Sequence, residues 1–321
     1  MNRAYYRLTE THDPEERLED AALWKALRDA LGDNIRLVGT DEPAPKDGLF
    51  LGRGKRNEMN TNLLASLYIP YWEDPAFKNR CTRDFIIADF SEAYSACSRL
   101  LSGGNPVFLK STAQKHYARL FRDKDEFEEE MESMAYSFID RGPCLMVQQG
   151  VDMRFERRFL VIDREVVTQS PVAWHLTPMS RAQGDGARIE DTHFDTPKDL
   201  EGFTDPRLTR RMTEMARDIA AESDHPHLCV DLCVLGEDPE GPVEPVEWNP
   251  MQPGAVGLYA CDPARIADAV KTHLDRNPGI YPGDPEEPGS ENAFNPASLE
   301  AFAGDDGDVL EELEFEDSPS P

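Results

Sequence analysis

The first part of the chain alternates between helical and strand-like patterns of apolar residues. Residues 14–31, "PEERLEDAALWKALRDAL", place apolar side chains three and four positions apart, with charged side chains between them. This spacing predicts an amphipathic helix, because positions three and four apart share one helix face. Residues 34–40 form a short apolar run that predicts a buried strand, and residues 64–73 predict another strand.

A second helix is predicted just before a pair of glycines. Residues 91–102 have helical spacing, with Ser91 as the expected N-cap and Gly103-Gly104 as the end of the helix. Helices that alternate with short strands are typical of α/β domains. We therefore expect a small N-terminal α/β domain over residues 1–103.

The middle of the chain has a different pattern. A turn at Asp163-Arg164 separates two apolar runs, as in a β-hairpin, and helical segments lie between the other runs. Hairpins mixed with helices predict an α+β domain with a largely antiparallel sheet over residues 104–279. The predicted strands lie within residues 105–111, 144–151, 157–171, 227–236 and 243–250, and the predicted helices at about 124–140, 206–222 and 263–275.

The last part of the chain, residues 280–321, is rich in proline, glycine and acidic residues. From Asp284 onward it has thirteen Asp and Glu and no Lys or Arg. Such a segment has too few apolar side chains to offset the entropy lost on folding, so we expect an acidic, disordered tail. We interpret it as a solvated tail, and the alternative is a docking peptide for a basic protein partner.

Composition limits the classes of function. The net charge of −28 disfavours general nucleic-acid binding, because phosphates would be repelled. No apolar run is long enough to span a membrane, and the N-terminus lacks the apolar stretch of a signal peptide, so we expect a cytoplasmic protein with reduced thiols. "HPHLC" at residues 225–229 has metal-ligand residue types, but without a second cluster a loop leading into a strand is favoured.

Candidate chemistry begins with three oxygen-bearing side chains in apolar runs. Glu247 and Asn249 are two positions apart in "EPVEWNP", so both point to one face of the predicted strand. The run is either a bulged edge strand or a metal site. Asp231 interrupts the apolar run "LCVDLCVL", where an isolated buried carboxylate is costly. Carboxylate and amide oxygens on neighbouring strands are the ligands that Mg²⁺ needs.

Two further pairs of polar residues are candidates for ligand binding. Lys110 ends the run "PVFLK" and Lys115 follows in a small-residue loop, a placement that suits nucleotide phosphates. The alternative is a strand end with two solvated lysines. Glu156 and Arg158 share one strand face, either as ligand-binding groups or as an exposed ion pair that contributes little stability.

The order of these groups resembles the nucleotide site of the ATP-grasp superfamily. A strand lysine, a Gln hinge, E-x-R on a hairpin, a strand Asp and E-x-N follow one another over roughly residues 104–275. D-Alanine–D-alanine ligase belongs to this superfamily, and the sequence is also similar to the D123-type assembly proteins. The resemblance implies an α+β ATP-grasp fold with a nucleotide bound between the N-terminal domain and the ATP-grasp domain. Many members carry Glu where this hinge carries Gln.

The resemblance also implies roles for individual residues. Lys110 and Lys115 would contact the phosphates of ATP, and Arg158 would stabilise the transferring phosphoryl group. Glu156 would contact the ribose. The adenine edge would meet Gln148, Gln149 and Val151, and Mg²⁺ would be held by Asp231, Glu247 and Asn249.

The function implied by this resemblance is ligation. Members typically phosphorylate a carboxylate and let an amine or thiol attack the acyl-phosphate, so we expect an ATP-dependent ligase acting on a small molecule or on a peptide or protein terminus. The alternative is an ATP-binding assembly factor of the D123 type that binds a protein partner. Further candidates for substrate contact are His175, Ser170 and Arg181, with an aromatic-rich turn that carries an ordinary histidine as an alternative of at least equal weight. The basic run at residues 52–56 is either a clamp for carboxylate or phosphate or a solvated loop, and the two are evenly favoured.

Overall fold

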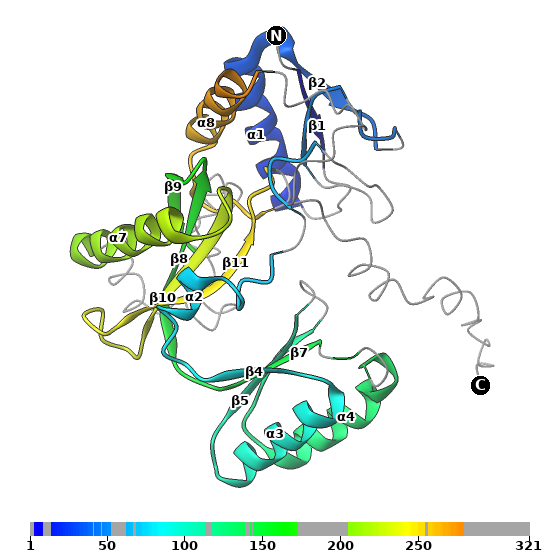
Figure 1. The fold of residues 1–321 in the computed structure, drawn as a ribbon, viewed down its shortest axis with the longest axis vertical. Coiled ribbons are helices and arrows are strands. Elements are labelled where there is room, and N and C mark those ends of the chain that lie inside the picture. The colour runs from blue at the N-terminus through cyan, green and yellow to red at the C-terminus, as the bar shows by residue number, and fades with distance from the viewer. Residues whose placement is uncertain are drawn as a thin grey trace, which may run out of the picture. The chain divides into compact units, whose positions relative to one another are not determined.

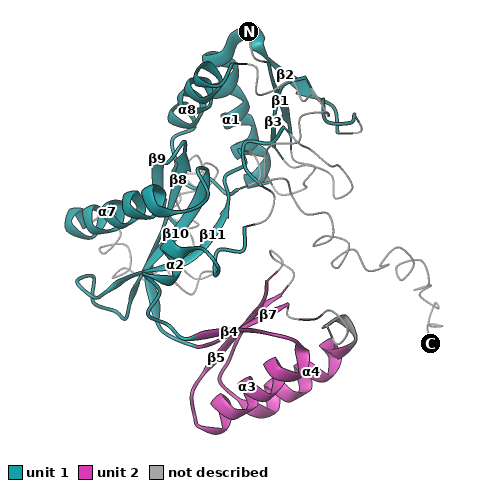
Figure 2. Ribbon diagram, viewed as in Figure 1, with its two compact units in different colours: residues 1–84, 150–288 teal, residues 85–149, 289–321 magenta. Residues whose placement is uncertain are grey.

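The computed structural model contains two compact units (Figure 2). Unit 1 comprises Met1–Asp84 and Gly150–Pro288, and unit 2 comprises Phe85–Gln149 and Gly289–Pro321. The units group residues by their contacts in space, whereas the predicted domains are consecutive segments of the sequence. The domain boundaries after residues 103 and 279 therefore stay a prediction. The structure describes residues 3–8, 14–40, 42–45, 47–52, 62–66, 69–112, 117–138, 142, 144–172, 205–253 and 256–278.

A small parallel sheet with one helix forms the N-terminal part of unit 1. Its elements are β1 (Ala4–Arg7), α1 (Pro14–Leu31), the 3₁₀ turn η1 (Gly32–Asn34), β2 (Ile35–Val38) and β3 (Leu49–Gly52). The strands are parallel and lie in the order β2-β1-β3. Helix α1 buries Leu23, Leu27 and Leu31 at intervals of four, and each buried leucine contributes about 2 kcal/mol. The helix predicted over residues 14–31 is confirmed.

The structure corrects both strand predictions in this region. β2 is an edge strand, not a buried one, because it pairs only with β1 and leaves Arg36 and Leu37 exposed. Within residues 64–73 the described residues form no strand. The nearby Leu63 makes only an isolated bridge to Phe50, residues 71–73 form a turn, and residues 67 and 68 lie outside the described residues.

An antiparallel sheet forms the rest of the framework of unit 1. Its strands are β8 (Met153–Ile162), β9 (Glu165–Pro171), β10 (Leu228–Leu235) and β11 (Val243–Pro250), in the order β11-β10-β8-β9. All neighbouring pairs are antiparallel, as predicted. Asp163 and Arg164 join β8 to β9 with φ values of 52° and 63°, which matches the type I′ turn of a two-residue hairpin.

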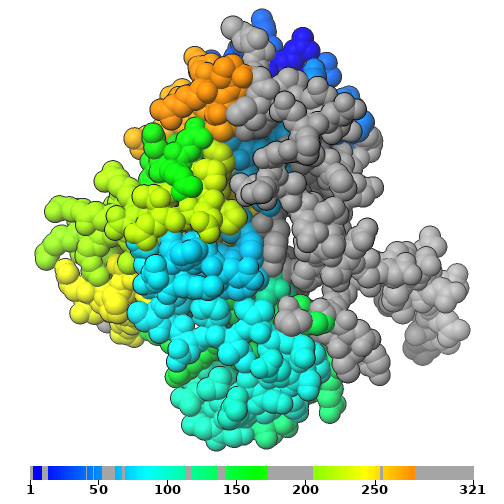
Figure 3. Space-filling model, viewed as in Figure 1, coloured from blue at the N-terminus to red at the C-terminus, as the bar shows by residue number. Residues whose placement is uncertain are grey.

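Two helices pack on this framework. Helix α7 (Pro206–Glu222) packs across all four strands, and helix α8 (Pro263–Arg276) packs against α1, β8 and β9 (Figure 1). One apolar cluster contains side chains of the parallel sheet, α1, α8, β8 and β10, so the two sheets of unit 1 share a core. The outer sides of α7 and α8 lie at the molecular surface (Figure 3). Both helices lie within a residue of their predicted ranges.

The short helix α2 (Pro75–Lys78) adds an aromatic contact to unit 1. Its Phe77 ring meets the ring of Trp248 edge to face, with centroids 5.6 Å apart. Both side chains are fully buried, so α2 and β11 are joined through aromatic packing.

Unit 2 is a four-stranded antiparallel sheet with two helices. The elements are β4 (Phe85–Ala88), α3 (Phe90–Ser102), β5 (Val107–Ser111), β6 (Ala118–Phe121), α4 (Lys124–Phe138) and β7 (Leu145–Gln149), with strand order β4-β7-β5-β6. Val107 and Leu109 of β5 and Leu145 and Val147 of β7 join apolar side chains of α3 and α4 in one core. Because alternate strand residues share a face, both helices cover the same face of this sheet.

Helix α3 begins earlier than its sequence pattern predicts. Its N-cap is Asp89, whose carboxylate accepts the backbone N–H of Glu92 at 2.8 Å, and Ser91 is already inside the helix. Asp and Ser are equally good caps, so composition does not separate the two positions. The helix ends before Gly103, as predicted.

Two further features bear on the setting of the chain. Among the described residues, no helix combines the length and the apolar composition needed to cross a lipid bilayer. All six cysteines lie within the described residues and are free thiols.

A buried ion pair joins the residues before unit 2 to strand β11. Nε of Arg83 is 3.1 Å from Oε2 of Glu244, and the two side chains are 4% and 1% exposed. Glu244 also accepts hydrogen bonds from the backbone N–H and the hydroxyl of Thr82, and Arg83 donates to the carbonyl of Pro245. Removing one member would leave the other charge buried without its partner, which is strongly destabilising.

We predict that Glu244→Gln lowers the free energy of unfolding by about 3 kcal/mol, because Arg83 would keep a buried charge without a counter-charge. Urea denaturation followed by tryptophan fluorescence measures this, since all four tryptophans lie within unit 1. The control is Asp29→Asn, which removes the exposed Lys25–Asp29 pair and should change stability by less than about 0.5 kcal/mol. Equal losses in the two variants would contradict the prediction.

Candidate functional site

Asp231 lies at the centre of the antiparallel sheet of unit 1. Its strand, β10, has β8 on one side and β11 on the other, and Asp231 is directly opposite Arg158 on β8 and Glu247 on β11. Residues directly opposite each other in antiparallel strands project from the same face. Asp231 is 1% exposed, so its carboxylate is buried between groups from two neighbouring strands.

Arg158 is the counter-charge of Asp231. Its guanidinium donates from Nε to Oδ1 at 2.9 Å and from Nη2 to Oδ2 at 2.8 Å, which makes a bidentate pair. Nη1 donates to the carbonyl of Gly257 at 2.9 Å, and the guanidinium carbon lies 5.4 Å from the centroid of the Tyr259 ring. Burial alone would lower the pKa of Arg158, but the attraction of Asp231 outweighs it and raises this pKa, so the arginine stays charged.

Glu247 and Asn249 continue this polar face on β11. Nδ2 of Asn249 donates to Oε1 of Glu247 at 3.1 Å, and both residues are half-buried. Trp248 between them points to the opposite face and is buried there. The structure thus brings Asp231, Glu247 and Asn249 to one face of the sheet, while their role as metal ligands stays a prediction.

Strand β11 lies at the edge of the sheet, and its pairing with β10 shifts register between Asp231 and Leu232. The bulged edge strand expected as one interpretation of "EPVEWNP" is therefore the backbone arrangement. This arrangement is compatible with a metal site, because bulges at sheet edges commonly re-aim side chains next to functional sites.

Glu156 is two positions before Arg158 on β8 and is half-buried. The residue before it, Phe155, has a φ of 55°, and the pairing of β8 with β10 shifts register in this part of the strand. Burial raises the pKa of Tyr259 to about 12, and the negative charge of Glu156 adds to the shift, so the phenol stays protonated near pH 7. The charge of Arg158 acts on the Tyr259 phenol in the opposite direction, so Glu156 and Arg158 both influence this ring electrostatically.

Glu19 on α1 is a site residue that sequence reasoning missed. Its carboxylate accepts the backbone N–H groups of Leu258 at 3.0 Å and Tyr259 at 2.9 Å. Burial raises the pKa of Glu19, while these two hydrogen bonds and the charge of Arg158 act in the opposite direction. Glu19 and Arg158 thus bind the backbone of the same segment, residues 257–259.

The signal for Glu19 is present in the helix spacing. The buried stripe of Leu23, Leu27 and Leu31 continues toward the N-terminus at four-residue intervals to Glu19 and Glu15. Acidic side chains on the inward face of a helix indicate partners in the fold, because unpaired buried carboxylates are costly.

Two of the nucleotide-contact candidates of unit 2, Lys110 and Gln148, lie on the same face of its sheet. Lys110 of β5 is opposite Met146 of β7, and Gln148 of β7 is opposite Phe108 of β5, so Lys110 and Gln148 are diagonal neighbours on the face away from α3 and α4. Lys110 is half-buried and Gln148 is buried. Gln149 points to the other face, where its amide contacts Asn105 at 3.4 Å.

The remaining predicted residues are placed as follows. Val151 is in unit 1 and is exposed. Ser170 is fully buried, and its hydroxyl accepts the N–H of Ala260 at 3.0 Å and donates to the carbonyl of Pro171 at 2.8 Å, so it supports the backbone. Lys115, His175, Arg181 and residues 53–56 of the basic run lie outside the described residues.

Comparisons with known proteins bear on the fold. No protein-family model matches the sequence, and no curated protein matches it. Among similar solved structures, the D-cycloserine synthetase DcsG has 16% sequence identity and a TM-score of 0.54, over 84% of this chain and 99% of its own. D-Alanyl-alanine synthetase A from Vibrio cholerae O1 biovar eltor str. N16961 has 11% identity and a TM-score of 0.51, over 86% of this chain and 99% of its own.

This chain has the ATP-grasp fold. The predicted α+β fold class is confirmed, with its small parallel sheet at the N-terminus and its antiparallel sheets. The resemblance found in the sequence is therefore confirmed at the level of the fold.

We predict that Glu19→Gln changes how stability depends on pH. Because the pKa of Glu19 is raised in the folded state, its protonation stabilises the fold. This contribution is complete below the ordinary pKa of a glutamate and is lost as the pH rises through the raised pKa. The variant lacks this titration, so its thermal midpoint relative to that of the native chain should increase over this pH range.

Thermal unfolding at a series of pH values measures the effect, with the exposed Asp29→Asn on α1 as the control. The loss of one hydrogen bond in Glu19→Gln shifts the midpoint by a constant amount, so the slope with pH is the informative quantity. A difference between variant and native chain that does not change with pH would refute the assignment.

Proposed function

We propose that this chain is an ATP-dependent carboxylate–amine or carboxylate–thiol ligase that uses Mg²⁺. The observation that carries the proposal is the polar face of Asp231, Glu247, Asn249 and Arg158 in a chain with the ATP-grasp fold. The proposed carboxylate belongs to a small molecule or to a peptide or protein terminus.

The donor set on this face fits magnesium. Two carboxylates and one amide supply hard oxygen ligands, with no sulfur or imidazole among the three, and this chemistry suits Mg²⁺ better than transition metals. A carboxylate can accept about four contacts, so the pair with Arg158 does not prevent Asp231 from holding a cation. Mg²⁺ bound by Asp231, Glu247 and Asn249 would neutralise negative charge on the phosphates of ATP.

Arg158 suits the stabilisation of a transferring phosphoryl group. Asp231, the carbonyl of Gly257 and the ring of Tyr259 hold its guanidinium in place before any substrate arrives. A charge that is already oriented needs no reorganisation during the reaction, and such preorganised groups supply much of the rate enhancement in charge-transfer steps.

The proposal also includes the nucleotide contacts that the sequence resemblance implies. In unit 2, Lys110 and Lys115 would bind phosphate oxygens and Gln148 and Gln149 would meet the adenine edge. The sheet face that carries Lys110 and Gln148 is the one that α3 and α4 leave uncovered. In unit 1, Val151 would also meet the adenine edge, and Glu156 would hold the ribose.

The proposed reaction has two displacements. An oxygen of the substrate carboxylate attacks the γ-phosphorus of ATP, and ADP leaves with the electrons of the broken P–O bond. The amine nitrogen or thiol sulfur then attacks the acyl carbon, phosphate leaves, and the nucleophile loses its proton to solvent or to a carboxylate. Neither step needs a protein nucleophile, so positioning and charge neutralisation are the tasks of the protein.

We expect ATP binding to depend on Mg²⁺ and on the proposed ligands. Calorimetric titration should show at least tenfold weaker ATP binding, about 1.4 kcal/mol, for Glu247→Ala and Asn249→Ala, and a similar loss for the native chain in EDTA. The control is Glu237→Ala, an exposed glutamate between β10 and β11. Unchanged affinity in EDTA and in both variants would show that the magnesium assignment is wrong.

We expect ADP and phosphate release that increases when a suitable carboxylate and amine are supplied together. Arg158→Lys keeps the positive charge but loses the bidentate geometry, so it should lower kcat by about 100-fold with a smaller effect on the KM for ATP. Arg154→Lys on the same strand is the control. A coupled ADP assay over amino acids, dipeptides and peptide termini measures this.

The assay also discriminates the alternative function. Turnover with a carboxylate–amine pair would exclude a pure binding role. No turnover over the whole panel, together with ATP binding and tight association with one protein, would overturn the ligase proposal in favour of an assembly factor.

A further inference from the structure

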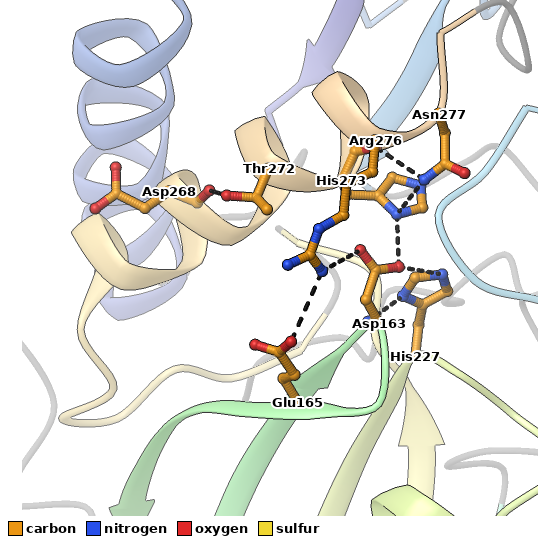
Figure 4. Close-up of polar contacts among 8 residues, drawn as sticks. All are labelled: Asp163, Glu165, His227, Asp268, Thr272, His273, Arg276 and Asn277. Carbon is orange, nitrogen blue, oxygen red and sulfur yellow. Dashed lines mark hydrogen bonds and ion pairs between the residues drawn. The ribbon is translucent and has the colours of Figure 1, made fainter.

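Two histidines and one aspartate converge at the turn between β8 and β9, outside the residues assigned to ATP. Asp163 is the first residue of that turn, His227 precedes β10, and His273 lies in the last turn of α8. Figure 4 shows these three side chains, here called the turn cluster, meeting from three different elements of unit 1.

The carboxylate of Asp163 is shared by the two rings. Oδ1 of Asp163 is 2.7 Å from Nδ1 of His273 and 3.9 Å from Nε2 of His227. One ligand atom from each residue lies within 4.8 Å of the others, and the ring centroids are 5.0 Å apart. Two ligands of a tetrahedral zinc ion lie about 3.4 Å apart, so shifts of less than about 1 Å would complete a common coordination shell.

The burial of the turn cluster suits metal binding. His227 and His273 are 8% and 5% exposed, whereas the side chain of Asp163 is 23% exposed and offers a path from solvent. Burial lowers the pKa of His227 to about 4, and the neighbouring His273 acts in the same direction, so the His227 ring is neutral near pH 7. The neutral imidazole is the form that binds metals.

Arg276 and Asn277 lie next to the turn cluster, and Arg276 supplies a positive charge beside the carboxylate of Asp163. Nη1 of Arg276 lies 4.0 Å from Oδ2 of Asp163 and 3.7 Å from Oε1 of Glu165, and the arginine side chain is largely exposed. Nδ2 of Asn277 lies 3.3 Å from Nδ1 of His273. Arg276 repels a bound cation, and its carboxylate partner Glu165 and its exposure to water reduce this repulsion.

We propose that the turn cluster binds one divalent transition-metal ion of the zinc type through Asp163 Oδ1, His227 Nε2 and His273 Nδ1. Two imidazole nitrogens and one carboxylate oxygen are donors that Zn²⁺ favours, whereas Mg²⁺ and Ca²⁺ favour oxygen alone. Three protein ligands leave a fourth position for water. This site is chemically distinct from the oxygen-only face of Asp231 and does not depend on the proposed ligase function.

The sequence alone indicated one of the three proposed ligands, His227. "HPHLC" at residues 225–229 has metal-ligand residue types but no second cluster near it in the chain. The fold supplies the missing ligands, since the hairpin turn brings Asp163 and the end of α8 brings His273 to His227. A metal ion there would join β8, β10 and α8.

Metal binding must change the protons on both rings. The backbone N–H of Asp163 donates to Nδ1 of His227 at 3.2 Å, so a neutral His227 carries its proton on Nε2. Coordination through Nε2 moves that proton to Nδ1 and displaces this hydrogen bond. Nδ1 of His273 is hydrogen-bonded to Oδ1 of Asp163, and both atoms are proposed ligands. Metal binding therefore replaces this hydrogen bond by two bonds to the metal, and Nδ1 of His273 can carry no proton. The change of tautomer is a signature specific to this site.

The test uses the full chain after treatment with a chelator, titrated with Zn²⁺ by calorimetry and with Co²⁺ by absorption. We expect saturable binding of one ion per chain, a higher thermal midpoint with Zn²⁺ and at least tenfold weaker binding in Asp163→Asn and His273→Gln. Asp163→Asn is the more informative variant, because Asn also adopts the positive φ of this position and preserves the turn. His225→Asn, in the same loop as His227, is the control and should bind as the native chain does.

Several results would overturn the proposal. One is the absence of saturable Zn²⁺ binding by the native chain. Another is equal affinity in the native chain, Asp163→Asn and His273→Gln, which would assign the metal to other groups. A thiolate-to-cobalt charge-transfer band would assign it to a cysteine. Long-range ¹H–¹⁵N spectra should show the His227 proton on Nε2 without Zn²⁺ and on Nδ1 with it, and an unchanged tautomer would exclude His227 as a ligand.

Discussion

Unit 1 depends on the compensation of a carboxylate buried in the middle of an antiparallel sheet. Arg158 donates hydrogen bonds to both carboxylate oxygens of Asp231 and to the carbonyl of Gly257. The next backbone N–H groups, of Leu258 and Tyr259, are held by Glu19 of α1. One line of charged contacts therefore runs from the central strand through a loop segment to the N-terminal helix, and each contact fixes the geometry of the next.

Such a pair is not the arrangement that maximises stability. Apolar residues of similar volume at the positions of a buried ion pair are often as stabilising as the pair or more so. A buried pair of Asp231 and Arg158 is therefore compatible with the functional role proposed for them. Their neighbours support this interpretation, because Glu247 and Asn249 extend the same face with further oxygen atoms at a partly exposed sheet edge. Strongly interacting charges at one place are typical of functional sites.

Much of the fold was predictable because its signals are local. Helix α1 follows from spacing alone, and the hairpin turn at Asp163-Arg164 follows from the two apolar runs beside it. The shared face of Glu247 and Asn249 follows from the two-residue period of a strand. What these residues bind is a separate question, and the roles assigned to them remain predictions.

Two of the strands that were missed lack such local signals. Strands β1 and β3 have four residues each, all buried, so neither shows an alternation of apolar and polar positions. The contact of Glu19 with Leu258 and Tyr259 joins residues far apart in the chain, and no pattern within α1 specifies that partner. The turn cluster was missed for the same reason, because Asp163, His227 and His273 meet only in the folded chain.

The way the chain is divided between the two units also constrains the order in which they can fold during synthesis. The described part of unit 2 is one continuous stretch within Phe85–Gln149, so all its strand partners exist as soon as that stretch has been made. Helix α1 is made much earlier, yet it packs against α8, which ends at Arg276. Helix α1 can meet the strands of the small parallel sheet early, but its contact with α8 must wait until α8 has been translated. Unit 2 can therefore complete its sheet during synthesis before unit 1 does, although unit 1 contains the N-terminus.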